Sequence, residues 1–177
     1  MAGQRLTDKT ALEQQTGSGD LYMVVDVNDT TGSAAGTSKK IDSKFVIQTD
    51  KFSLNNTEVK ALDATPKVLV GALSGYMVTP ISVTILTTYA SATESSNYNL
   101  LLGYDSSQVA LYWDFASRFM GTITTSNAFV FSGGVPQAKG VNAASIINHP
   151  FEMWSSGAFN GGWSCDVYMT YCYTKVL

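Results

Sequence analysis

Apolar and polar residues alternate along much of this chain with the two-residue period of β-strands. The clearest stretches are residues 21–27, residues 81–87 and residues 163–176, of which the last is the longest. Beyond residue 60, no stretch shows helical or heptad periodicity. Apolar runs bounded by turn residues indicate further strands at 68–70, 98–104, 109–115, 121–125 and 128–131.

The chain divides into two expected units near residue 50. In residues 1–50, strands at 21–27 and 37–41 enclose a loop of small and polar residues. Two strands with little core are marginally stable in water, so this module is expected to need a partner surface. Its apolar side chains are predicted to attach it to that partner, namely Leu21, Met23, Val25, Val27, Phe45 and Ile47.

Residues 51–177 hold the repeated strands, with residues 48–60 as a linker or first strand. Short strands with regular turn signals favour an antiparallel β-sandwich. The predicted fold class is therefore all-β: a small N-terminal β module followed by a jelly-roll-like sandwich.

Charged residues are few and unevenly placed. They make up 14% of the 177 residues, and 17 of the 25 precede residue 68. A soluble domain usually has about 25%. The second unit is therefore covered either by Ser, Thr, Asn, Gly and Tyr, or by another chain, because interface cores are depleted in charge.

Several classes of function are disfavoured. The net charge of −3 and the lack of a basic cluster beyond Lys39-Lys40 argue against nucleic-acid binding. No apolar run is long enough for membrane insertion, and the polar N-terminus does not resemble a secretory signal. Cys165 and Cys172 are an odd number of residues apart in one expected strand, so they face opposite sides and should not form a disulfide.

The sequence offers three sets of candidate catalytic or metal-binding residues. His149 has no metal-ligand partner nearby in sequence. Asp26, Asn28 and Asp29 faintly resemble a calcium loop, but the glutamate of an EF-hand is missing. Asp114 and Glu152 could form a glycosidase carboxylate pair, although any chain with 14 acidic residues offers such pairs. The prediction is a protein with no catalytic site, metal or cofactor, and not an enzyme.

Aromatic residues crowd the second unit, and they allow two interpretations. Core and intersubunit packing is favoured, because aromatics dominate the packing of small β-folds. The alternative is a surface that stacks on a host glycan. Loop tips at 90–97 and 135–147, rich in small and polar residues, could hold variable contacts. The candidate glycan contacts are Trp113, Trp154, Phe159 and Trp163.

Two segments resemble virion proteins of tailed bacteriophages: head fibres, collar fibres and tail fibres. Residues 6–41 match in an acidic apolar strand, the loop Asp-Thr-Thr-Gly-Ser-Ala-Ala-Gly-Thr at 29–37, and the exit Lys39-Lys40-Ile41. Residues 61–177 resemble the C-terminal β-domain of the same proteins, ending in a tyrosine-rich strand. The first motif is the more specific of the two.

The resemblance implies a structural protein of the virion, made in the host cytoplasm. Its N-terminus would bind a capsid, collar or tail protein, and its second unit would project, associated as a homotrimer. Because the chain lacks a long shaft, a short head fibre or capsid decoration protein with weak adhesion to host or environmental glycans is favoured. The alternatives are a collar or tail-fibre adaptor involved in receptor binding, a carbohydrate-binding module, and a carbohydrate-active enzyme.

Overall fold

The computed structural model describes residues 21–32, 34–42, 45–106, 111–115, 120–121, 124–132 and 142–176. The chain separates into two compact units, residues 1–46 and residues 47–177. The division falls just before the boundary expected at residue 50, because residues 48–50 already belong to a strand of the second unit. None of the helices in these described ranges is long and apolar enough to cross a membrane.

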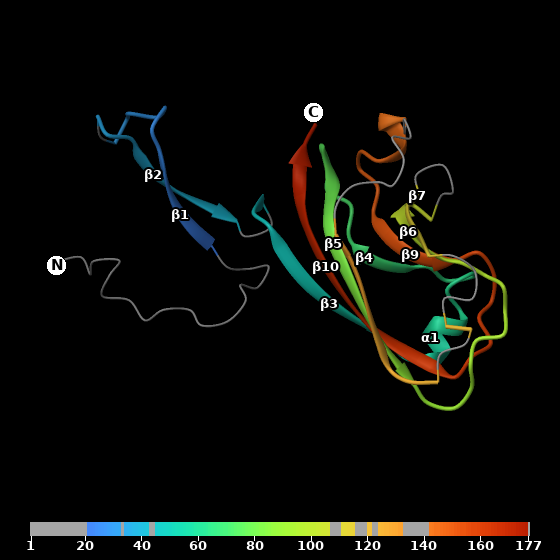
Figure 1. The fold of residues 1–177 in the computed structure, drawn as a ribbon. Coiled ribbons are helices and arrows are strands. Elements are labelled where there is room, and N and C mark those ends of the chain that lie inside the picture. The colour runs from blue at the N-terminus through green and yellow to red at the C-terminus, as the bar shows by residue number, and fades with distance from the viewer. Residues whose placement is uncertain are drawn as a thin grey trace. The chain divides into compact units, whose positions relative to one another are not determined.

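The first unit contains a two-stranded antiparallel hairpin (Figure 1). Strand β1 (Leu21–Asp26) pairs with β2 (Thr37–Asp42), so that Asp26 lies opposite Thr37. Gly36 closes the loop between them with φ of 113°, and a Cβ there would lie 2.8 Å from the carbonyl oxygen of Asp26. Only glycine fits such a position without strain.

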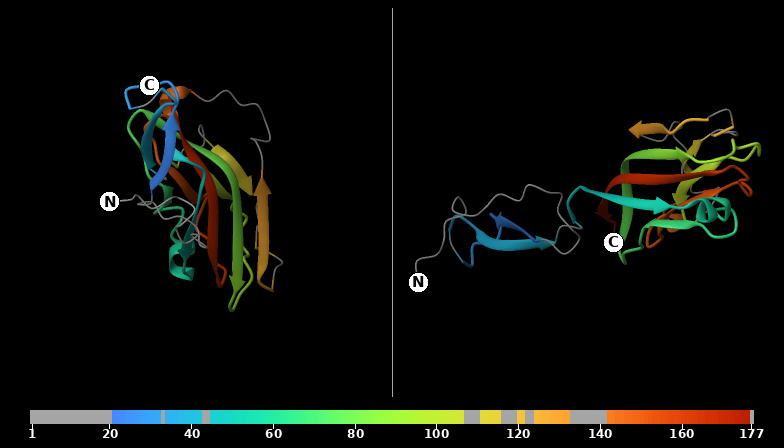
Figure 2. Two further views of the ribbon diagram at one scale, coloured as in Figure 1. Left: turned by 90° about the vertical axis from the view of Figure 1, so that its left-hand side faces the viewer. Right: turned by 90° about the horizontal axis from the view of Figure 1, so that it is seen from below.

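The second unit is an antiparallel β-sandwich of two four-stranded sheets (Figures 1 and 2). One sheet has the order β3-β10-β5-β8, and the other β4-β9-β6-β7. The strands are β3 (Gln48–Leu54), β4 (Lys67–Val70), β5 (Tyr76–Tyr89), β6 (Leu100–Tyr104), β7 (Leu111–Phe115), β8 (Asn127–Ser132), β9 (Phe151–Ser155) and β10 (Trp163–Lys175).

Counted within the sandwich, the strand orders are 1-8-3-6 and 2-7-4-5, the arrangement of a jelly roll. The all-β prediction and the antiparallel sandwich are confirmed. Successive strands mostly change sheet, so nearly all ladder pairs join segments distant in sequence. The β10–β5 pair is the longest ladder and runs from Trp163 opposite Tyr89 to Lys175 opposite Tyr76.

The core lies between the two sheets and follows the alternation read from the sequence. On β10 every second residue from Trp163 to Tyr171 is buried, while the residues between them are half-buried. Thr170 lies opposite Ser82 and Tyr171 opposite Pro80, so Ile81 is the extra residue of a bulge in β5, directly beside Pro80. A bulge accommodates a proline within a sheet, because proline has no N–H to give to the ladder.

Four local features differ from the expected elements. The strand β9 and the short helix α1 (Asn56–Lys60) were not predicted, and neither was the 3₁₀ turn η4 (Ala143–Ser145). Residues 124–125 lie outside any strand, and residues 122–123 lie outside the described residues, so the strand at 121–125 is not found. Cys165 and Cys172 are free thiols, as expected.

Candidate functional site

The four aromatic residues considered for glycan stacking are all buried. Trp113, Phe159 and Trp163 belong to the core between the sheets, and Trp154 is buried on β9. Phe159 packs edge-on against Trp163, with ring centroids 5.4 Å apart. Because stacking on a sugar needs an open ring face, these four rings are packing residues in this structure.

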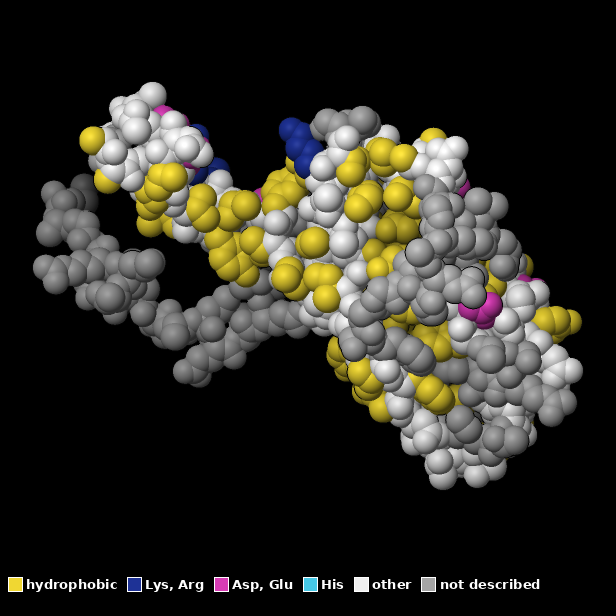
Figure 3. Space-filling view, turned by 45° about the horizontal axis from the view of Figure 1, so that its top comes forward, with side chains coloured by type: hydrophobic (Ala, Val, Ile, Leu, Met, Phe, Trp, Pro, Cys, Tyr) yellow, Lys and Arg dark blue, Asp and Glu magenta, His cyan; other side chains and the backbone are white. Residues whose placement is uncertain are grey.

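The apolar residues predicted to attach the protein to a partner lie mostly at the surface. Met23, Val25 and Val27 are 72%, 59% and 68% exposed, and Figure 3 shows hydrophobic side chains on the hairpin. Phe45 is half-buried, and Ile47 is exposed at the start of the second unit. The side chain of Leu21 lies outside the described residues. Their role in attachment stays a prediction.

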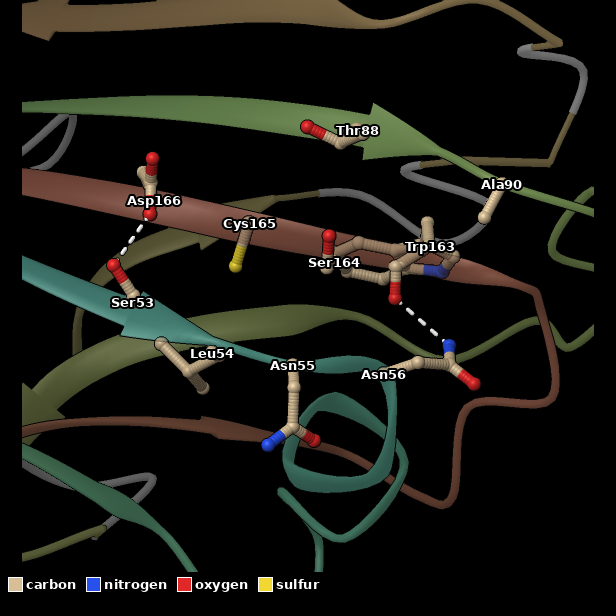
Figure 4. A pocket seen from close by; sticks show the side chains of 10 residues that line it. All are labelled: Ser53, Leu54, Asn55, Asn56, Thr88, Ala90, Trp163, Ser164, Cys165 and Asp166. Atoms are coloured by element: carbon tan, nitrogen blue, oxygen red, sulfur yellow. Dashed lines mark hydrogen bonds between the residues drawn. The ribbon is translucent and has the colours of Figure 1, made fainter.

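A surface hollow lies at one end of the β3-β10-β5-β8 sheet, where β3 and β5 end and β10 begins (Figure 4). Its volume is about 430 Å³, which falls in the range of small-ligand pockets. The lining combines the apolar or buried residues Leu54, Ala90, Trp163 and Cys165 with the polar residues Ser53, Asn55, Asn56, Thr88, Ser164 and Asp166.

Asn55 and Asn56 form one wall of the hollow, at the start of α1. Asn55 Oδ1 accepts a hydrogen bond from the Glu58 backbone N–H at 3.0 Å, and Glu58 reciprocates in a capping box. Asn56 Nδ2 donates to the carbonyl oxygens of Gly161 and Trp163, at 3.0 and 2.8 Å. Among the described residues, these bonds leave the amide nitrogen of Asn55 and Oδ1 of Asn56 as groups for a ligand.

Asp166, another residue of the lining, forms an ion pair on the outer side of the sheet. Ser53 Oγ donates to Asp166 Oδ1 at 2.6 Å, and Lys51 Nζ lies 2.9 Å from Asp166 Oδ2. The hydrogen bonds from Ser53 and Lys51 hold the pKa of Asp166 below its usual value, and the bond to Asp166 raises the pKa of Lys51. The pair is therefore ionised at neutral pH, and its charges balance.

Glu94 supports the hollow from within, although it is not among the residues predicted from the sequence. Its side chain is only 1% exposed. The carboxylate accepts hydrogen bonds from the backbone N–H groups of Ser96, Asn160 and Gly161 and from Nε1 of Trp163, at 2.8 to 3.3 Å. Burial alone would raise the pKa of Glu94, but the hydrogen bonds outweigh burial and lower it. Glu94 thus holds Trp163 and Gly161 in place, and Asn56 donates hydrogen bonds to the backbone carbonyls of the same two residues.

The hollow offers hydrogen-bonding groups rather than reactive ones. The hydroxyls of Thr88 and Ser164 can both donate and accept hydrogen bonds. The amide nitrogen of Asn55 adds a donor, and Oδ1 of Asn56 adds an acceptor. Burial raises the pKa of the Cys165 thiol to about 12, so it is no nucleophile at neutral pH. Within the described ranges, no three His, Cys, Asp or Glu side chains are grouped to hold a metal.

In the candidate calcium loop, the ammonium group of Lys39 lies between the two carboxylates. Lys39 Nζ lies 2.9 Å from Asp26 Oδ2 and 2.8 Å from Asp29 Oδ2. The hydrogen bond from Lys39, helped by Thr31, lowers the pKa of Asp29 to about 2. Lys39 thus occupies the place between the carboxylates where a cation would bind.

The remaining candidates do not converge on one site. His149 Nδ1 lies 3.3 Å from Asp105 Oδ2. Asp114 on β7 and Glu152 on β9 pair with β6 from opposite sides, and each is bonded to a different neutral residue. The loop at 90–97 is held by Glu94, whereas residues 135–141 of the second candidate loop lie outside the described residues.

No protein-family model matches the chain, and no curated protein sequence matches it. Among solved structures, the chain is similar to a carbohydrate-binding module from lichenase 5A of Cellvibrio mixtus, solved in complex with cellotriose. The identity is 12%, the match covers 89% of this chain and 88% of that chain, and the TM-score is 0.29. Similarity at this level carries no argument about the ligand of this chain.

Proposed function

We propose that the second unit is a non-enzymatic domain that binds neutral carbohydrate through the hollow of Figure 4. The observation that carries the proposal is the lining: hydroxyl and amide groups surround a pocket of about 430 Å³ at the end of a sheet. A site built from such groups recognises ligands rich in hydroxyls, because an unmatched partner would leave these groups unpaired.

The charge of the hollow favours neutral over acidic sugars. Asp166 is its charged residue, and Lys51 already neutralises that carboxylate. A sulfated or carboxylated glycan would therefore gain no cationic partner within the lining, whereas a neutral sugar can exchange hydrogen bonds with Asn55, Thr88 and Ser164.

Binding measurements on a panel of neutral and acidic oligosaccharides test the proposal. The double variant Thr88→Val with Ser164→Ala removes two hydroxyls from the hollow and should weaken binding about five- to tenfold. Thr30→Val, an exposed threonine of the first unit, is the matched control and should change nothing. Failure to bind any neutral glycan, or equal binding by the double variant, contradicts the proposal, and release of reducing ends contradicts its non-enzymatic part.

For the first unit we propose attachment to a larger assembly, favoured by the apolar residues Met23, Val25 and Val27 exposed on the hairpin. An isolated two-stranded sheet with such a surface needs a partner. Combined with the sequence resemblance, this supports display on a tailed-phage virion as a short head fibre or decoration protein. The alternative location is the collar or tail. Many copies, each a homotrimer, would convert weak sugar binding into avidity.

Assembly of particles with variant protein tests the attachment. The hairpin double variant Met23→Ser with Val25→Ser should lose incorporation into particles while the sandwich keeps its unfolding transition. Val130→Ser, an equally exposed apolar residue of the second unit, is the control. Normal copy number of the hairpin variant would refute attachment through these residues, and antibody labelling distinguishes head from tail.

A further inference from the structure

The outer face of the β3-β10-β5-β8 sheet continues directly from the hollow. Residues of β10 that alternate with the buried core positions point to this face. Ser164 at the hollow is followed on the same face by Asp166 and then by Tyr168. The register places these β10 residues beside partners from the neighbouring strands: Ser164 beside Thr88; Asp166 between Ser53 and Leu86; Tyr168 between Lys51 and Thr84.

Tyr168 is the aromatic residue of β10 on this face nearest to the hollow. Its ring is half-buried, and the Lys51 ammonium lies 5.7 Å from the ring centre, a cation–π distance. Tyr168 lies two residues beyond Asp166, which is about 6.6 Å along a strand. That step is comparable to the length of one hexose.

The surroundings of Tyr168 combine exposed apolar groups with hydroxyls. Leu86 and Val130 are 38% and 67% exposed on β5 and β8. Farther along the face, the hydroxyls of Thr49 and Thr170 share a hydrogen bond of 2.8 Å. Such a mixture suits a sugar ring, whose C–H face packs on aromatic and aliphatic groups while its rim exchanges hydrogen bonds.

We propose that this face extends the hollow into an elongated site for a neutral polysaccharide chain, with Tyr168 as the ring on which the second sugar stacks. The inference rests on the carbohydrate binding proposed for the hollow. A polysaccharide fits better than a second copy of this chain, because the ionised Lys51–Asp166 pair lies beside Tyr168 and interface cores are depleted in charge.

Calorimetric titration with neutral gluco-oligosaccharides of one to six sugars, in both α-1,4 and β-1,4 series, tests the extension. For the wild-type protein the affinity should rise with chain length in one series. Tyr168→Ala should lower the affinity for the longest sugar about five- to tenfold, and that for the single sugar much less. Tyr168→Phe keeps the ring and should preserve the length dependence. Tyr22→Ala, at an exposed tyrosine of the hairpin, is the control and should change neither value.

The outcomes separate the two proposals. If no sugar of any length binds, the hollow itself is not a carbohydrate site and both proposals fail. If sugars bind in the hollow but affinity is independent of length, or Tyr168→Ala has no effect on the longest sugar, only the extension fails. If Val130→Lys converts an oligomer into a monomer in sedimentation experiments, the face is a subunit interface and the extension is overturned.

Discussion

Nε1 of Trp163 donates a hydrogen bond of 3.3 Å to the Glu94 carboxylate inside the sandwich. The same carboxylate receives the backbone N–H of Gly161 at 2.8 Å. One buried acid thus ties the loop after β5 to the loop before β10. Buried ionised groups are rare unless they are fully hydrogen-bonded, and Glu94 meets that condition through four donors.

Replacing Glu94 by glutamine should destabilise the second unit by about 2–4 kcal/mol. The glutamine amide has one acceptor oxygen, so at least one buried N–H loses its partner, and its own NH₂ group faces other donors. Denaturant unfolding followed by tryptophan fluorescence measures the change. Glu152→Gln is the control, because Glu152 is also a hydrogen-bonded acid but is only half-buried. Its carboxylate accepts a hydrogen bond from the Ser106 hydroxyl. A smaller loss for Glu94→Gln than for Glu152→Gln would contradict the role of Glu94.

The stability of the unit should fall in acid partly through Glu94. The pKa of this group is lowered in the folded state from its ordinary value of 4.5. A lowered folded pKa means that the stabilisation is complete above the unfolded pKa and is lost as the pH falls through the folded value. Unfolding free energies measured between about pH 7 and pH 3 should decline below about pH 5.

The acid decline should be shallower in Glu94→Gln, which has no group to protonate at this position. Asp166 and Glu58 also have lowered pKa values and contribute to the decline in both proteins. Parallel curves for wild type and variant would show that Glu94 is not linked to stability.

Gly162 should tolerate no side chain. A Cβ at this position would lie 2.0 Å from Ser91 Oγ and 2.9 Å from the backbone nitrogen of Ala92. The Gly162 carbonyl also accepts a hydrogen bond from the N–H of Ala90 at 2.8 Å. The two loops therefore cannot move apart to make room for a Cβ without losing this bond. Gly162→Ala should therefore cost about 2–3 kcal/mol in thermal or chemical unfolding.

Gly71 provides the matched control for that substitution, because a Cβ there meets no atom within 4 Å. Gly71→Ala should change the free energy of unfolding by about 0.5 kcal/mol or less. Equal effects of the two substitutions would mean that the loops separate easily at Gly162.

The two thiols should differ in reactivity. Burial raises the pKa of Cys165 to about 12, whereas Cys172 is half-buried on the same strand. At neutral pH, an alkylating reagent should label Cys172 in the native protein and reach Cys165 only after unfolding. Mass spectrometry of the labelled protein locates the modified residue, with Cys172→Ser as the control that should remain unlabelled. Rapid native labelling of Cys165 would contradict its place in the core.

The sequence predicted much of the strand content but not all of it. The stretch at 163–176 was recognised because its alternation continues for many residues, so a single irregularity does not hide the period. Strand β9 was missed because it has only five residues, four of them buried, and a buried strand shows no alternation. Helix α1 is one turn long and is signalled only by its capping box, Asn55 with Glu58.

The hollow and its support could not be read from the sequence, because they join distant residues. Ser53 meets Asp166 across 113 positions, and Glu94 meets Gly161 across 67. A weak signal for Glu94 existed: it is an isolated acid in a loop of Ser, Thr and Ala, with an Asn-Gly-Gly turn elsewhere whose N–H groups need acceptors. Nothing in the sequence pairs those two loops.

By itself, the sequence determined that the chain is built of β-strands, because side-chain alternation is a local property with a period of two. It also determined which strand faces are apolar and that the second unit contains few charged residues. The tertiary structure decided which strands are neighbours, and therefore that the tryptophans lie inside while Asn, Ser, Thr and Asp groups gather at one end of a sheet. Strand order follows from packing the two sheets over the whole length of the chain, and such non-local contacts leave no pattern in any single segment.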